Sequence, residues 1–100
     1  MTKKYNYNFS SEKNYKLIQE RDISFEEIIA AIENNCLLDI IEHHNSQKYP
    51  NQKMYLIEFN FYVYLVPFVV EDDGTIFLKT IIPSRKATKK YLKETKNNEK

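Results

Sequence analysis

The run FYVYLVPFVV, residues 61–70, constrains the fold more than any other part of the chain. Nearly every position is apolar, and most residues are aromatic or β-branched, which is typical of a strand that is covered on both faces or lies centrally in a sheet. Pro67 has no N–H to donate, so we expect a bulge or a missing ladder bond there. The other helices and strands must therefore pack against this strand.

Three further segments have strand character. They are CLLDIIEH at 36–43, MYLIEFN at 54–60 and TIFLKTII at 75–82. Asn60 marks a hairpin turn before the central run, and Gly74 in EDDGT is placed where a turn needs positive φ. Because short turns join consecutive strands, the sheet is predicted to be antiparallel, with three or four strands.

Helical patterns precede and follow these strands. Residues 10–21 form one predicted helix and residues 25–34 a second, in which Ser24 and Glu27 make a capping box. After the last strand, Pro83 is expected to end the ladder, and Ser84 is expected to cap a final helix. Its inward stripe is predicted to include Ala87, Thr88, Tyr91, Leu92 and Thr95. The predicted fold class is α+β, with helices on one face of a small antiparallel sheet.

Length and composition indicate one domain that spans residues 1–100. The segments 1–9 and 96–100 are expected to fray. Cys36 is the only cysteine, which excludes an internal disulfide and favours a cytoplasmic location. No apolar run is long enough for a membrane span, no His/Cys spacing indicates a metal site, and we expect neither a cofactor nor a membrane partner.

Charge is divided unevenly along the chain. Residues 79–100 contain eight basic and two acidic side chains, a net charge of +6, whereas residues 1–78 contain seven basic and twelve acidic ones, a net charge of −5. Two interpretations remain open: a solvated terminal helix whose lysines suit the helix dipole, or a surface that binds an anionic partner.

The chain contains no standard catalytic motif. Cations together with aromatic rings are, however, the chemistry that binds single-stranded RNA. RNA can be cleaved without a metal when its own 2′-hydroxyl attacks, provided that the protein holds the geometry, moves protons and stabilises charge on the phosphate. Arginine suits the last task, and the chain has only Arg21 and Arg85. His43, in the only histidine pair, is a candidate acid or base.

Two stretches together resemble a known family. SSEKNYKLIQERDISFEEIIAAI and IFLKTIIPSRKATKKY are similar to the N-terminal half and the closing strand and helix of the BrnT-like toxins of type II toxin–antitoxin pairs. The resemblance covers roughly residues 9–93. It implies a RelE-type fold and ribonuclease activity that halts translation. It also implies a ribbon-helix-helix antitoxin as partner, RNA as the target, with ribosome-associated mRNA as one option, and operator DNA bound through the antitoxin complex.

The resemblance also suggests site residues. Arg85 falls on the arginine of the family's RKAT motif and Lys86 on the base after it. The chain departs from the family at Arg21-Asp22, where His-Gly is common, and at Thr80, where an arginine is usual. The predicted catalytic residues are Arg85, Lys53, His43 and Tyr91, and the predicted RNA-binding residues are Lys79, Lys86, Lys89, Lys90 and Lys93.

Two function classes follow. The first is a metal-independent RNA endonuclease toxin, with Arg85 as electrostatic clamp. The second is a non-catalytic protein that binds nucleic acid, or a degenerate toxin that binds its antitoxin and acts as co-repressor. Growth arrest that is lost in Arg85→Ala separates the two.

Overall fold

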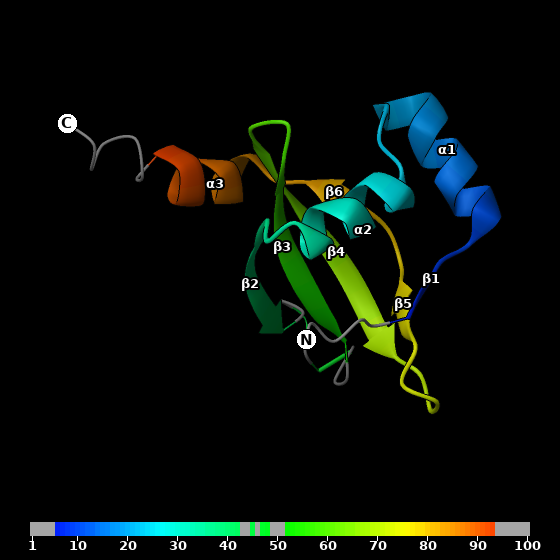
Figure 1. Ribbon diagram of the computed structural model, residues 1–100. Coiled ribbons are helices and arrows are strands. Elements are labelled where there is room, and N and C mark those ends of the chain that lie inside the picture. Colours follow the sequence, from blue (N-terminus) through cyan, green and yellow to red (C-terminus); the bar gives the residue numbers. More distant parts are fainter. Residues whose placement is uncertain (1–5, 43–44, 46, 49–51, 94–100) are drawn as a thin grey trace.

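The computed structural model describes residues 6–42, 45, 47–48 and 52–93, with the side chain of Lys93 excepted (Figure 1). The elements in chain order are β1 (Tyr7–Asn8), α1 (Ser11–Arg21), α2 (Phe25–Glu33), β2 (Leu37–Glu42), β3 (Lys53–Phe59), β4 (Tyr62–Val70), β5 (Ile76–Leu78), β6 (Ile82–Pro83), α3 (Arg85–Thr88) and the π-helix η1 (Lys89–Lys93). The α+β class is therefore confirmed.

The sheet is larger and less regular than the sequence predicts. Among the described residues it has six strands in the order β1-β5-β4-β3-β2, with β6 also paired to β4. β1 runs parallel to β5, and the other pairs are antiparallel, so the prediction of three or four antiparallel strands is wrong. β1 and β6 have two residues each, which is too short for an alternating pattern to reveal them.

β4 lies centrally, as its apolar composition predicts. β3 pairs with it in unbroken register, with Met54 opposite Pro67, so the predicted bulge at Pro67 does not occur. The carbonyl of Pro67 instead accepts a hydrogen bond from the Lys79 N–H at 2.8 Å. The register shift of the sheet lies in edge strand β2, between Leu37 and Asp39.

The β3–β4 turn consists of Asn60 and Phe61, which both have positive φ, 54° and 62°. Two left-handed residues define the turn type whose twist matches that of a hairpin, and glycine is the usual second residue. Gly74, in the following turn, has φ 90°, which confirms its predicted role. Phe61 is therefore an aromatic residue at a glycine position.

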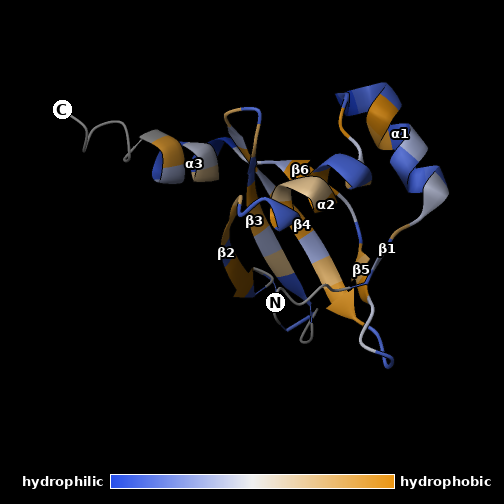
Figure 2. Ribbon diagram, in the orientation of Figure 1, coloured by the Kyte–Doolittle hydropathy of each residue, from blue (hydrophilic) through white to orange (hydrophobic). Residues whose placement is uncertain are grey.

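α2 covers one face of the sheet, and α1 lies to the side of the sheet and is joined to α2. Ser24 and Glu27 form the predicted capping box of α2. The buried Asn14 of α1 accepts a 2.7 Å hydrogen bond from the Phe25 N–H and donates one of 2.9 Å to Glu26, which joins the two helices. Figure 1 shows α2 crossing in front of β3 and β4, and Figure 2 shows hydrophobic residues along the strands behind it. The core cluster includes Leu17, Phe25, Ile28, Tyr55, Ile57, Val66, Phe68, Leu78 and Ile81.

Two predictions about the ends of strands are corrected. Tyr7 and Asn8 pair with Ile76 and Phe77, so the segment expected to fray is ordered at its end. Pro83 pairs with Tyr64 of β4 as the last residue of β6, so the proline is itself part of the ladder, which ends with it. A proline is tolerated here because β6 is a two-residue strand at the margin of the sheet. No described helix is both long and apolar enough to cross a bilayer.

Candidate nucleic-acid interface

Arg85 is the first residue of α3, and hydrogen bonds on both sides of it fix this helix to the sheet. The Ser84 N–H donates to the Val63 carbonyl at 3.0 Å, and Ser84 Oγ accepts from the Ala87 N–H at 3.0 Å. Thr88 Oγ1 donates to the Ser84 carbonyl at 2.7 Å and accepts from the Val63 N–H at 2.9 Å. The Arg85 side chain is exposed on this anchored turn.

The lysines of α3 and η1 share this exposure. Lys86, Lys89 and Lys90 are exposed, whereas Ala87, Thr88, Tyr91 and Leu92 are half-buried. The Nζ atom of Lys90 lies 5.7 Å from the centre of the Tyr91 ring. Lys93 belongs to η1, but its side chain lies outside the described residues, as does Thr95. The cations therefore form one outward face, with a less exposed side toward the sheet.

The helix itself is not a regular α-helix. After the single α-turn of α3 the chain continues as a π-helix over Lys89–Lys93. A π-helical segment is rare and is found often at functional sites. The predicted inward stripe is only half-buried, because the helix is attached at the margin of the sheet and does not cross it.

The side chain of Tyr91 already forms a hydrogen bond within the protein. Its hydroxyl donates to Asp39 Oδ2 of β2 at 3.0 Å. Burial, and after it the hydrogen bond and the charge of Asp39, raise the pKa of Tyr91 above its ordinary value. A phenol held in its protonated form is a poor base, so this contact fits a positioning residue better than a proton acceptor.

The structure places Lys53 and Lys79 away from the attachment point of α3. Lys53 begins β3 opposite Phe68, and the backbone of Lys79 pairs with Pro67, whereas α3 is attached at Val63. Val63 and Pro67 are four strand residues apart, or about 13 Å at about 3.3 Å per residue. His43 lies outside the described residues.

The position of Arg21 in the fold was not predicted from the sequence. Its Nη1 atom, at the end of α1, donates to the carbonyl of Ile81 at 2.7 Å. Both arginines of the chain therefore contact the segment 81–85 or belong to it. Their separation of more than sixty positions in the sequence gives no local signal of this approach.

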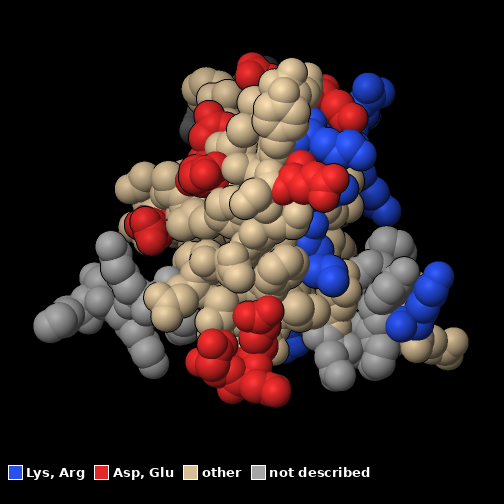
Figure 3. All heavy atoms as spheres, turned by 90° about the vertical axis from the view of Figure 1, so that its right-hand side faces the viewer, with Lys and Arg blue, Asp and Glu red and all other residues tan. Residues whose placement is uncertain are grey.

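Charge is segregated on the surface as well as along the chain. Figure 3 views the molecule from the right-hand side of Figure 1, and Lys and Arg side chains gather along one margin of that face, while Asp and Glu side chains form separate groups among neutral residues. Because α3 lies on the opposite side in Figure 1, this view does not show the basic face of α3 and η1.

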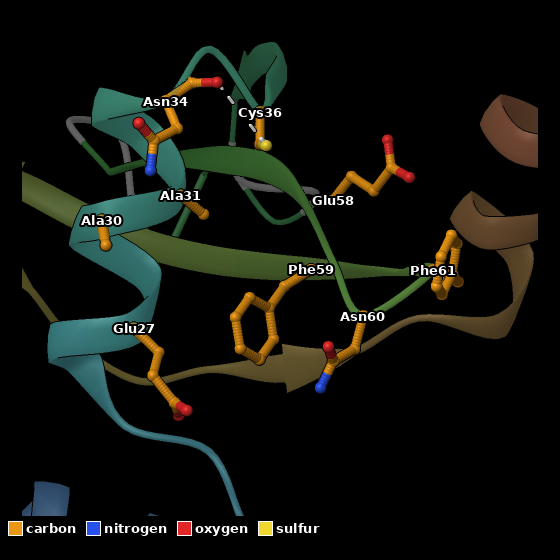
Figure 4. Close-up of a pocket in the computed structure, with 9 residues that line it drawn as sticks. All are labelled: Glu27, Ala30, Ala31, Asn34, Cys36, Glu58, Phe59, Asn60 and Phe61. Carbon is orange, nitrogen blue, oxygen red and sulfur yellow. Dashed lines mark hydrogen bonds between the residues drawn. The ribbon is translucent and has the colours of Figure 1, made fainter.

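A separate pocket of about 420 Å³ lies between α2 and the β3–β4 hairpin (Figure 4). Its lining includes Glu27, Cys36, Glu58, Phe59, Asn60 and Phe61. None of the described residues that line it is basic, so it is unsuited to phosphate. The exposed basic face is therefore a better candidate than this pocket for binding nucleic acid.

The described residues contain no group of three or more His, Cys, Asp or Glu side chains that could hold a metal ion.

The chain matches no known protein family, no curated protein and no solved structure in the comparisons made with each. The hypothesis of a nucleic-acid interface is therefore supported only by the geometry and charge of the residues described above.

Proposed function

We propose that this protein binds single-stranded RNA through Arg85 and the lysines of α3 and η1, as the toxin of a type II toxin–antitoxin pair with a BrnT-like, RelE-type fold. The anchored position of Arg85 is the observation that supports this proposal most directly. Hydrogen bonds from Ser84 and Thr88 hold its backbone on β4 while its guanidinium stays exposed. An exposed arginine on a fixed backbone can hold two phosphate oxygens with its planar guanidinium.

In this proposal the protein is a metal-independent endoribonuclease that acts in the cytoplasm. The 2′-hydroxyl of the RNA attacks the adjacent phosphorus, and the bond to the 5′ oxygen of the next nucleotide breaks. Arg85 stabilises the negative charge on the phosphate, and Lys86, Lys89 and Lys90 hold the neighbouring phosphates. A ribbon-helix-helix antitoxin covers the basic face, and the complex of the two binds operator DNA.

The second candidate is a non-catalytic protein that binds nucleic acid or an antitoxin and acts as co-repressor. One observation favours it, and it concerns Tyr91 and Lys53, the predicted proton-transfer residues that the structure describes. Tyr91 is bonded to Asp39, and Lys53 lies at the other end of the β3–β4 pairing. Cleavage needs a proton acceptor and donor within hydrogen-bond reach of the reacting oxygens, whereas binding does not.

Expression of the wild-type chain and of Arg85→Ala, with growth and cellular RNA followed together, tests the proposal. The toxin hypothesis expects growth arrest and new RNA 5′ ends with the wild type and neither with the variant. Lys13→Ala, which removes an exposed cation of α1, is the control and should behave as wild type. If the wild-type chain binds RNA but neither arrests growth nor cuts RNA, the enzyme hypothesis is rejected and the co-repressor hypothesis is retained.

A further inference from the structure

β2 forms one margin of the sheet, and among the described residues no strand pairs with its outer side. An edge strand presents unpaired N–H and C=O groups to any other extended chain. The last four residues of β2 are exposed, and they include two large aliphatic side chains, Ile40 at 49% and Ile41 at 36%. Residues 37–42 contain neither a proline nor a lysine, the residues that commonly protect such an edge. The β2 edge is therefore open to pairing unless another group blocks it.

The carboxylate of Asp39 provides such a block. Its Oδ1 atom accepts a hydrogen bond from the Ile40 N–H at 2.8 Å, so this N–H is not available to an added strand. β1, at the opposite margin of the sheet, has the same arrangement, because the Phe9 N–H that follows it donates to Asn8 Oδ1 at 2.8 Å. Both margins of the sheet thus carry a side-chain acceptor that competes with strand pairing.

Tyr91 fixes the Asp39 carboxylate in this orientation. The Tyr91 hydroxyl donates to Asp39 Oδ2 at 3.0 Å, so the two carboxylate oxygens are bonded to different parts of the chain, the backbone of β2 and the ring of η1. An exposed side chain without such a partner changes rotamer within picoseconds to nanoseconds. The hydrogen bond from η1 therefore keeps Asp39 where it occupies the Ile40 N–H.

We propose that the Asp39–Tyr91 pair closes the β2 edge to a second copy of the chain. A two-fold axis at Ile40 pairs β2 with its copy as antiparallel strands, in which the two Ile40 residues exchange both N–H···O bonds. Like charges do not oppose each other in this register, because Asp39 lies across from Ile41 of the copy. The pairing requires the N–H that Asp39 occupies. It uses none of the basic side chains, so it is independent of the proposed RNA binding.

Sedimentation equilibrium of the full-length protein tests the proposal. Asp39→Ala frees the Ile40 N–H in both copies, and its dissociation constant for a dimer should be lower than that of the wild type by about ten-fold or more, the effect of two added hydrogen bonds. Glu42→Ala is the matched control, because it removes an acidic side chain from the same exposed strand and leaves Asp39 in place. It should associate no more than the wild type. Tyr91→Phe should give an intermediate value.

Asp39→Ala combined with Ile40→Lys should return the protein to a monomer, because the two-fold axis brings the two lysines opposite each other. Circular dichroism checks that each variant is folded. Equal association of Asp39→Ala and Glu42→Ala overturns the proposal, and so does a dimer that persists in the double variant. A Tyr91→Phe variant that associates no more than the wild type overturns the role of Tyr91.

Discussion

The hydroxyl of Tyr91 donates a 3.0 Å hydrogen bond to Oδ2 of Asp39 and so ties the π-helical end of the chain to edge strand β2. The other oxygen of the same carboxylate accepts from the Ile40 N–H at 2.8 Å. Asp39 therefore links the backbone of β2 to the segment that presents the lysines.

Tyr91→Phe is expected to lower the free energy of unfolding by about 0.5–1.5 kcal/mol, the typical net contribution of one hydrogen bond. Asp39→Ala and the double variant complete a cycle measured by chemical denaturation. Non-additivity of similar size is expected for a direct contact. If the two single effects simply add, the contact does not contribute to stability.

The same pair predicts a loss of stability at alkaline pH. The pKa of Tyr91 is raised in the folded state, by burial first and then by Asp39, so the fold favours the neutral phenol. That contribution is fully present below the unfolded pKa of about 10 and is lost as the pH rises through the folded value. Denaturation midpoints of wild type and Tyr91→Phe should therefore converge above about pH 10. A constant difference between them would exclude the linkage.

Thr88→Val should weaken the attachment of α3 to the sheet. The substitution keeps the shape but leaves the Val63 N–H without its side-chain acceptor, at an expected cost of about 1–3 kcal/mol. Thr80→Val is the matched control, because the Thr80 hydroxyl bonds to no described residue. Denaturation gives the two stabilities, and RNA affinity should fall only in Thr88→Val. Equal losses of stability in the two variants would show that the hydrogen bond from the Val63 N–H to Thr88 Oγ1 makes no contribution of its own.

Much of the fold could be predicted because local chemistry decides it. The Ser24–Glu27 capping box, the glycine turn at Gly74 and the central place of β4 all follow from patterns within a few residues. β1 and β6 could not be predicted, since two-residue strands are stabilised by their partners across the sheet. Pro67 was expected to cause either a bulge or a missing ladder bond, and the unbroken β3–β4 register excludes the bulge.

The candidate site, like the fold, could be predicted only in part from the sequence. Ser84 as the cap before Arg85 follows from the sequence, because the signal is a proline, a serine and a helical run. The contact of Arg21 with Ile81 depends on how α1 packs, and no local pattern encodes it. The separation of Lys53 from Arg85 depends on strand register, which residue types alone do not give.

Phe61→Gly should stabilise the protein by about 0.5–1 kcal/mol, because glycine relieves the left-handed strain at a small cost in unfolded-state entropy. Gly74→Ala is the mirror experiment, since Gly74 has φ 90° and open space around its Cα. It should destabilise by a similar amount. Thermal melts of both variants test the pair. A destabilised Phe61→Gly would mean that the ring makes contacts that its 88% exposure does not suggest.

RNA binding should depend on salt in proportion to the number of cations that contact phosphates. Each of Lys86→Ala, Lys89→Ala and Lys90→Ala is expected to reduce the slope of log affinity against log salt concentration by about 0.7 for a single strand. Arg85→Ala should cost more affinity, about ten-fold or above, because a guanidinium binds phosphate in two places. Fluorescence anisotropy with a labelled oligonucleotide measures both quantities. An unchanged slope in all three lysine variants would show that RNA binds to another part of the surface.

The parallel pairing of β1 with β5 has a consequence for biosynthesis. Tyr7 leaves the ribosome well before its partner Ile76, which lies 69 positions later in the sequence. The β3–β4 hairpin can close as soon as it emerges, whereas the two-residue strand β1 must wait for β5. The sheet is therefore completed only after β5 has emerged, so a truncated product that ends before β5 lacks both this closure and the arginine turn that follows it.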